Sequence, residues 1–287
     1  MREEAKCYPS LSAKLEYNLL MVISDKIFVV TGAGSGIGKA LVEALLEKGA
    51  KVAAVDIHEE TLQQLKQSVS EKSDRISTHT LDISDKQAVE KLPSEVIEAH
   101  GTVDAIINNA GIIQPFVKIN DLDYKSIEKV MNINFYGTLY MTKSFLPHLL
   151  PRPEAHIANV SSMGGFLPVP GQSVYGASKA AVKLMTEGLY AELIDTSVNV
   201  SVVFPGATET NITKNSGVDI PDSAASQAKK YKTLPAKKAA EIIVNGIEKN
   251  KPQIFVGSDS KLMNRLYRLN PIMATKLIAK QMKDLLS

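Results

Sequence analysis

Short runs of β-branched and aliphatic residues alternate with helical patterns along most of this chain of 287 residues. This alternation restricts the fold more than any other feature of the sequence. The runs that predict strands are residues 26–30, 51–55, 75–81, 103–107, 156–160, 199–204 and 253–256. Nearly continuous apolar strands of this length are typical of parallel sheets that helices cover on both faces.

Helical patterns fill the intervals between these strands. Leu41, Val42, Leu45 and Leu46 lie on one face of the first predicted helix, which Gly49 can end. Further helices are predicted at residues 59–70, 85–98, 123–148, 173–193 and 236–248. Strand, helix, strand units at this spacing require right-handed crossovers and a parallel sheet. The predicted fold class is therefore α/β, a doubly wound parallel sheet (Rossmann fold) in a single domain.

We place this catalytic domain at residues 25–257, between an N-terminal extension (1–24) and a helical C-terminal extension (258–287). The formal net charge of +2 argues against a nucleic-acid binder held mainly by phosphate contacts. The single cysteine, Cys7, excludes a disulfide framework, and no histidine cluster suggests a metal site. No apolar run approaches the ~20 residues that span a bilayer, and the first residues lack the apolar segment of a signal peptide. We therefore expect a cytoplasmic protein.

A glycine-rich turn follows the first predicted strand and precedes the first helix. Its pattern, T-G-x-x-x-G-x-G, runs through Thr31, Gly32, Gly36 and Gly38. The pattern G-x-G-x-x-G does not fit, because Ile37 stands where its last glycine would be. Glycines here allow the backbone to approach a pyrophosphate closely, and the amides at a helix N-terminus suit an anion. The turn predicts a dinucleotide site, although a glycine turn without a ligand is the other interpretation.

Asp56 ends the second predicted strand, 18 residues beyond Gly38. A carboxylate there can accept hydrogen bonds from the adenosine ribose of NAD and would repel the 2′-phosphate of NADP. Neither Ser35 nor Ile57, beside the two motifs, is basic. We therefore expect NAD(H) as the preferred cofactor and NADP(H) as the alternative. An ordinary turn aspartate would also fit this position.

Tyr175 and Lys179 lie four residues apart on one predicted helix and so share a face. A free tyrosine has a pKa near 10, so it acts as a base at neutral pH only if its pKa is lowered by about 3 units. A nearby ammonium group favours the phenolate and lowers the pKa. Alone this pair is a weak signal, but Ser162 stands thirteen residues before Tyr175.

Seven motifs, in order, resemble those of the short-chain dehydrogenase/reductase family, in the variant with a core of about 250 residues. The resemblance covers residues 26–257. The motifs are residues 31–38, Asp82, residues 108–111 (Asn-Asn-Ala-Gly), Asn134, residues 159–162, residues 175–179, and Pro205-Gly206 leading to Thr210.

The resemblance implies catalytic roles for four of these residues. Tyr175 would be the general acid/base, and Ser162 would hydrogen-bond the reacting oxygen. Lys179 would lower the pKa of Tyr175 and hold the nicotinamide ribose. Asn134 would interrupt its helix and hold a water that relays protons to Lys179, with Asn132 as the rival for this role.

The same resemblance implies the cofactor contacts. Asp82 and Ile83 would contact the adenine, and Pro205 with Thr210 would face the nicotinamide. Asn109 would support the floor of the site, or it is a turn residue that bonds only backbone groups. The expected cofactor contacts are Thr31, Gly32, Ser35, Gly36, Ile37, Gly38, Asp56, Asp82, Ile83, Asn109, Ala110, Gly111, Tyr175, Lys179, Pro205, Gly206 and Thr210.

Residues 211–233 form a polar segment between the sixth strand and the next helix. In this family that segment closes over the substrate, and a long loop in a compact domain is often a lid. The expected substrate contacts are Ser162, Met163, Phe166, Tyr175 and Ile212. No arginine is placed to hold a carboxylate, so we expect a secondary alcohol or ketone of moderate hydrophobicity.

The C-terminal extension holds six basic residues against two acidic ones. Its apolar residues recur at near-helical intervals that Pro271 interrupts. We favour packing against the domain or a partner subunit, because family members often form homodimers or homotetramers. A basic amphipathic helix can also lie on an anionic membrane surface, so peripheral membrane contact through 258–287 is the second interpretation.

These features predict an NAD(H)-dependent oxidoreductase that moves a hydride between nicotinamide and an alcohol carbon. The first alternative is an NADPH-dependent carbonyl or 3-oxoacyl reductase that uses the same site. An alternative from another class is a nucleotide-binding sensor without catalysis. Such a sensor has little chemical need for Ser162, Tyr175 and Lys179 together.

Overall fold

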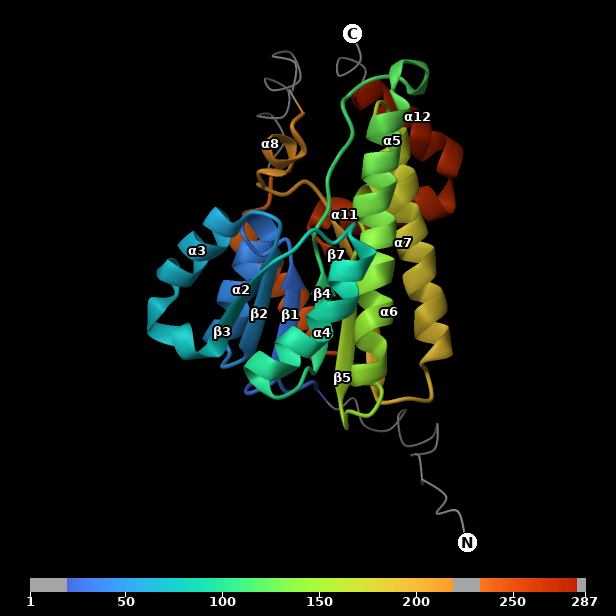
Figure 1. The fold of residues 1–287 in the computed structure, drawn as a ribbon. Helices are drawn as coiled ribbons and strands as arrows, with labels where there is room; N and C mark the ends of the chain where they lie inside the picture. The colour runs from blue at the N-terminus through green and yellow to red at the C-terminus, as the bar shows by residue number, and fades with distance from the viewer. Residues whose placement is uncertain (1–19, 219–232, 283–287) are drawn as a thin grey trace, which may run out of the picture.

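The computed structural model describes residues 20–218 and 233–282, and a parallel sheet forms the centre of this part of the chain (Figure 1). Its seven strands are β1 (Ile27–Thr31), β2 (Lys51–Asp56), β3 (Ile76–Thr80), β4 (Ala105–Asn108), β5 (Ala155–Val160), β6 (Val198–Pro205) and β7 (Gln253–Val256). They stand in the order β3-β2-β1-β4-β5-β6-β7, and every neighbouring pair is parallel. The predicted doubly wound α/β domain is confirmed.

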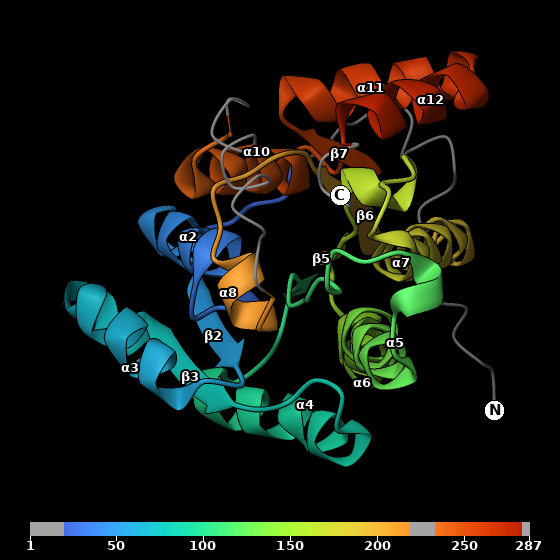
Figure 2. The same cartoon turned by 90° about the horizontal axis from the view of Figure 1, so that it is seen from above.

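Helices cover both faces of the sheet (Figure 2). One face carries α2 (Gly36–Glu47), α3 (Glu59–Ser68) and α10 (Ala236–Glu248). The other face carries α4 (Lys86–His100), α6 (Thr138–Leu149) and α7 (Ser173–Glu192). The two faces differ because successive side chains of a strand point in opposite directions.

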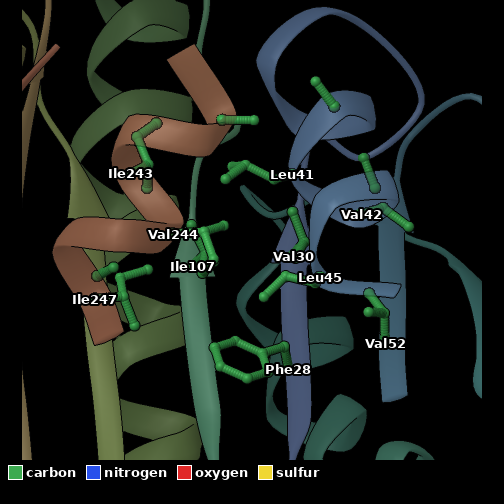
Figure 3. Packing of buried hydrophobic residues seen from close by; sticks show 14 of the residues in the cluster. Phe28, Val30, Leu41, Val42, Leu45, Val52, Ile107, Ile243, Val244 and Ile247 are labelled. Carbon is green, nitrogen blue, oxygen red and sulfur yellow. The ribbon is translucent and has the colours of Figure 1, made fainter. Parts of the chain in front are cut away.

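Alternation along β1 illustrates how the two cores form. Phe28 and Val30 pack on the side of α2 and α10, whereas Val29 packs on the side of α4. Figure 3 shows Leu41 and Leu45 of α2 above β1, beside the apolar side chains of α10. Each large apolar side chain buried in this way contributes about 1.5–3 kcal/mol to folding. The β-branched runs therefore become strands because both of their faces are covered.

The long helix predicted at residues 123–148 differs from the structure. It consists of α5 (Tyr124–Met131), a π-helical segment η3 (Asn132–Gly137) and α6. The wider segment turns Asn134 fully inward, and a single π-helical turn of this kind is often found at a functional site. Short elements that periodicity could not predict are the 3₁₀ helices η1 (Ser70–Arg75), η2 (Ile119–Asp121) and η4 (Met163–Gly165), and α8 (Ile212–Ser216).

The strand order reverses its direction between β1 and β4. The chain proceeds from β1 to β2 and β3 on one side, and from β4 to β5, β6 and β7 on the other. The loops that leave the carboxyl ends of β1 and β4 therefore diverge and open a crevice between them. In sheets of this type, ligands bind at that point.

Buried His156 on β5 makes the fold sensitive to acid. It is 1% exposed, and its Nε2 lies 2.8 Å from Ser201 Oγ. Burial, partly offset by a hydrogen bond with Asn250, lowers the pKa of His156 to about 4 from an ordinary value of 6.5. Because the folded pKa is the lower one, protonation favours the unfolded chain. The stability that neutral, buried His156 contributes to the folded chain is fully present above pH 6.5 and is lost as the pH falls toward 4.

We expect this group to remove about 3 kcal/mol of unfolding free energy over that interval. Urea unfolding at pH 7 and pH 4.5 measures the loss in the wild type and in His156→Gln, which should lose less. His58→Gln, at an exposed histidine, is the control and should behave as the wild type. Equal losses in His156→Gln and the wild type would contradict the assignment.

Candidate active site

A cavity of about 390 Å³ lies at the carboxyl edge of the sheet, over the point where the strand order reverses. It extends from the end of β2 past the glycine turn to α7 and the end of β6. The predicted site residues that line it are Gly32, Ser35, Gly36, Ile37, Asp56, Asp82, Ile83, Asn109, Ala110, Gly111, Ser162, Tyr175, Lys179, Pro205, Gly206, Thr210 and Ile212. The structure thus brings together residues that stand up to 180 positions apart, from Gly32 to Ile212.

The glycine turn is shaped by positions that a side chain could not occupy. Gly32 and Gly36 have φ of +66° and +52°, a backbone conformation that glycine adopts readily. A Cβ atom on Gly38 would collide with the carbonyl oxygen of Gly32. Helix α2 can therefore begin directly against the end of β1. Gly38 belongs to this packing and does not line the cavity.

The first turn of α2 suits an anion. Ser35 occupies the N-cap position, but its side chain does not cap the helix. Instead, Ser35 Oγ accepts a hydrogen bond of 2.8 Å from Asn215 Nδ2, beyond the end of β6. The amides at this N-terminus carry partial positive charge and have no side-chain acceptor at the cap. The arrangement fits the pyrophosphate of a dinucleotide cofactor.

Asp56 both supports the glycine turn and faces the cavity. Its Oδ2 accepts a hydrogen bond of 2.8 Å from the Gly34 amide, and its Oδ1 accepts one of 3.0 Å from the His58 amide. Among the described residues, the lining contains two basic ones, His58 and Lys179, and Lys179 lies with Tyr175 on α7. In this part of the chain, no basic lining residue other than His58 lies beside Asp56 to neutralise a 2′-phosphate.

Thr31 and Asn109 join the ends of β1 and β4. Thr31 Oγ1 accepts hydrogen bonds from the amides of Asn109 (3.0 Å) and Ala110 (3.1 Å). Asn109 Nδ2 donates to the Thr31 carbonyl at 3.0 Å. Thr31 was expected to contact the cofactor, but it lies beneath the lining and braces the floor. Asn109 braces backbone as well, yet it also reaches the cavity.

Ser162 and Tyr175 both line the cavity, and their side chains are hydrogen-bonded to each other. Ser162 follows β5, and its Oγ accepts a hydrogen bond of 3.0 Å from the Gly164 amide. Burial raises the pKa of Tyr175, and a hydrogen bond with Ser162 lowers it by less. The neighbouring Ser161 also lines the cavity, but its hydroxyl donates to the Lys179 carbonyl at 2.7 Å. Of the two adjacent serines, Ser162 is therefore the one beside Tyr175.

Lys179 is 3% exposed, and its Nζ donates a hydrogen bond of 2.9 Å to the Val160 carbonyl. Burial lowers the pKa of Lys179 to about 8. In this structure burial raises the pKa of Tyr175, and the hydrogen bond with Ser162 lowers it by less. Lys179 Nζ is bonded to the end of β5, and the lowering of the Tyr175 pKa by this ammonium stays a prediction.

Asn134 is fully buried next to this cluster, whereas Asn132 is exposed. Its side chain pairs with the backbone of Ile112, accepting from the amide and donating to the carbonyl, each at 2.9 Å. It also donates to Ser178 Oγ at 3.0 Å. Asn134 does not line the cavity. A Cβ atom on Gly111 would lie 3.0 Å from Lys179 Nζ and 3.1 Å from Asn134 Oδ1, so this glycine separates the two side chains.

Gln114 caps the helix that carries Tyr175 and was not predicted from the sequence. Its Oε1 accepts hydrogen bonds from the amides of Val174 (2.8 Å) and Tyr175 (2.9 Å), and its Nε2 donates to the Gly171 carbonyl at 3.0 Å. The side chain is 1% exposed. Two donors of the α7 N-terminus are thus satisfied by a loop that follows β4. In the sequence, the only sign of this capping role is that a polar residue stands three positions after Gly111.

Two of the expected substrate residues lie elsewhere. Met163 and Phe166 pack toward the C-terminal helices, and the Phe166 ring lies 5.5 Å from that of Phe204. Neither lines the cavity, because the extension covers them. Ile212, on α8, does line it, together with Ile112 and Ile113, which were not predicted. Of the predicted lid at 211–233, residues 219–232 lie outside the described part of the chain.

Within the described residues, no group of three or more His, Cys, Asp or Glu side chains could hold a metal ion. In the same part of the chain, no helix is long and apolar enough to cross a bilayer.

Comparison with known proteins identifies the family to which the chain belongs. The family profile described as short chain dehydrogenase matches residues 26–220. SadH of Mycobacterium tuberculosis, which is named an oxidoreductase, is 34% identical over 260 residues, or 88% of this chain and 94% of that protein.

Solved structures match over most of the chain as well. A short-chain dehydrogenase/reductase of Burkholderia phymatum, in complex with NAD, superposes with a TM-score of 0.81 at 24% identity and covers 88% of this chain and 96% of its own. At that identity the likeness shows the fold. A short-chain dehydrogenase of Burkholderia cenocepacia, in complex with NADP, gives a TM-score of 0.76 at 26% identity and covers 90% and 99%.

Proposed function

The chain belongs to the short-chain dehydrogenase family, and from this we propose that it is an NAD(H)-dependent oxidoreductase that interconverts a secondary alcohol and a ketone of moderate hydrophobicity. One observation carries the proposal. Ser162, Tyr175 and Lys179 reach the same cavity as the glycine turn that suits a dinucleotide pyrophosphate. A site of this kind holds a redox cofactor and a proton donor within reach of one substrate atom.

The side chains divide the reaction between them. NAD(H), when bound, supplies the hydride acceptor or donor. Tyr175 exchanges a proton with the substrate oxygen, and Ser162 hydrogen-bonds the same oxygen while charge develops on it. Because burial raises the pKa of Tyr175, the phenol keeps its proton at neutral pH and can donate it to a ketone oxygen. Lys179 is hydrogen-bonded to the Val160 carbonyl, and Asn134 is hydrogen-bonded to the backbone of Ile112. The two side chains offer a route for protons to Tyr175.

The chemistry of the lining supports an uncharged substrate. The lining includes Ile112, Ile113 and Ile212, and no arginine occurs among the described lining residues. A panel of alcohols and ketones, followed by NADH absorbance, tests the class. We expect turnover of secondary alcohols or ketones with apolar substituents. Turnover restricted to small, highly charged hydroxy acids would contradict the proposal.

An NADPH-dependent carbonyl or 3-oxoacyl reductase is the second candidate. Its support is the relative from Burkholderia cenocepacia, whose structure contains NADP. Our preference for NAD(H) rests on the Asp56 carboxylate at the cavity wall. Direct titration of both cofactors separates the candidates, and tighter binding of NADPH by the unaltered enzyme would favour the second.

Substitutions at Asp56 test the same point. Asp56→Ala should lower the affinity for NADH and reduce the preference for NADH over NADPH by about tenfold or more, because a charged acceptor is lost. It also removes the acceptor of the Gly34 and His58 amides. Asp56→Asn is the matched variant, since it removes the charge and keeps one acceptor oxygen. It should shift the preference with a smaller loss of thermal stability than Asp56→Ala.

We further propose a homodimer or homotetramer in the cytoplasm. Large side chains outside the C-terminal extension support an oligomer, since Tyr124 on α5 is 82% exposed and Leu184 on α7 is 70% exposed. Light scattering on the full chain measures its mass. A monomer at micromolar concentration would contradict this part of the proposal.

A further inference from the structure

The C-terminal extension folds into two helices beyond β7, α11 (Ser258–Leu269) and α12 (Pro271–Gln281), which pack against each other. In Figure 2 they form the outermost layer next to β7. Pro271, which interrupts the apolar pattern, occupies the first turn of α12. The Asn270 side chain caps that helix by accepting from the Met273 amide at 2.9 Å. The pair is therefore a helical hairpin with a defined turn.

The inner side of the hairpin is fixed to the domain. Ala274 and Ile278 of α12 are buried against Leu167, in the segment that follows the serine loop. Asp259 accepts a hydrogen bond of 2.8 Å from the Ala207 amide, and Ser260 Oγ donates to the Phe204 carbonyl at 2.9 Å. Packing against the domain, which we favoured from the sequence, therefore accounts for one side of each helix.

The outer side of α11 combines charge with apolar surface. At 100° per residue, Lys261, Leu262, Arg265, Arg268 and Leu269 fall within one arc of about 120°. All five are exposed, with Leu262 at 65% and Leu269 at 84%. The remaining arc contains the residues that face the domain, so the two sides of this helix are cleanly divided.

The outer side of α12 repeats this composition. Ile272 is 69% exposed, Met273 48% and Leu277 39%, and they share one arc of about 140° with exposed Lys276 and Lys280. We call these ten outward residues of α11 and α12 the hairpin surface. Single exposed apolar residues are common on proteins. Here five of them adjoin five basic residues on two neighbouring helices.

The charge of the hairpin surface is uniformly positive. The single acidic residue between 258 and 282 is Asp259, and its carboxylate is engaged by the Ala207 amide. Among the described residues, none of the five basic side chains forms an ion pair. An amphipathic helix with basic residues beside leucine and isoleucine is typical of binding to the surface of a lipid bilayer.

We propose that the hairpin surface binds an anionic membrane surface, with the lysines and arginines at lipid phosphates and the apolar side chains in the headgroup boundary. A second copy of the chain is the main rival occupant. A two-fold contact would place the same patch of each copy against the other and bring like charges together. Lysine is also depleted in protein interfaces. Charge complementarity therefore favours lipid.

Co-sedimentation of the full chain with vesicles tests this inference. We expect binding to vesicles that contain phosphatidylserine, little binding to phosphatidylcholine alone, and weaker binding as salt is added. The triple variant Lys261→Gln/Arg265→Gln/Arg268→Gln should bind roughly a hundredfold more weakly, since each charge contributes roughly fivefold. These residues lie outside the cavity, so turnover of a soluble substrate should not change.

A matched variant separates local charge from net charge. Lys66→Gln/Lys91→Gln/Lys237→Gln removes the same charge from exposed sites on α3, α4 and α10 and should bind as the wild type does. Equal weakening by both triple variants would overturn the proposal, as would absence of binding to anionic vesicles.

Replacing apolar residues of the hairpin surface distinguishes binding to lipid from contact with a second copy of the chain. Leu269→Ser/Ile272→Ser should lower vesicle binding at least about tenfold and leave the mass in solution unchanged. The proposal would be overturned if the wild type did not bind vesicles and the double variant had a smaller mass in solution than the wild type. The hairpin surface would then be an interface between copies of the chain. Thermal unfolding checks that each variant is folded.

Discussion

Replacing Tyr175 with phenylalanine is expected to lower kcat by about 10²–10⁴-fold, the range that general acid/base catalysis contributes. The change removes one oxygen atom from a partly buried side chain that lines the cavity and leaves the ring in place. Ser162 would then have no phenol as its partner, and the substrate oxygen would have no proton donor. Cofactor affinity should change little, because the glycine turn and Asp56 are untouched.

Tyr190→Phe is the matched control for this variant. Tyr190 lies on the same helix, is 40% exposed and does not line the cavity. It should keep full turnover. Steady-state kinetics on the best substrate of the panel, with NADH binding measured separately, completes the test. Full turnover in Tyr175→Phe would contradict the proposed mechanism, since another group would then have to supply the proton.

Alanine at Gly38 should be far more damaging than alanine at Gly188, although both glycines lie in helices. At Gly38 the new Cβ would collide with the Gly32 carbonyl, and neither partner is a flexible side chain. The start of α2 must therefore move away from β1. We expect a loss of about 1–3 kcal/mol of stability and at least a tenfold loss of NADH affinity.

At Gly188 nothing lies within 4 Å of the added Cβ. Alanine is the better helix former, so Gly188→Ala should raise stability by about 0.5–1 kcal/mol. Thermal unfolding and a cofactor titration on both variants measure the two effects. If Gly38→Ala bound NADH as tightly as the wild type, close approach of α2 to β1 would not be what shapes the cofactor site.

The strands and most helices were predictable because burial dictates their composition. Both faces of β1 are covered, so apolar residues occupy every position of this strand up to Thr31. Seventeen of the residues expected from the motifs and from the segment after the sixth strand likewise line one cavity. Periodicity, in contrast, could not find the π-helical turn around Asn134, because a local change of helical pitch leaves little trace in the pattern.

Hydrogen bonds between distant segments were also beyond the reach of sequence patterns. Gln114 and Thr31 are held by hydrogen-bond partners that lie far away in the sequence. No local pattern of residues predicts these bonds. Met163 and Phe166 were expected to face the substrate, because the sequence does not say where the C-terminal extension packs. In the structure both are partly buried and pack against the cluster of Leu167, Ala274 and Ile278.

The Gln114 cap has a consequence for how the enzyme can vary. In the loop that follows β4, residues 109–114 are attached at both ends, through Asn109 to the glycine turn and through Gln114 to the start of α7. Its length is therefore set by the distance between these two attachments. Insertions that a surface loop would tolerate should here displace α7, which carries Tyr175, relative to the floor of the cavity. Changes in substrate preference are therefore expected in segments outside residues 109–114, such as α8.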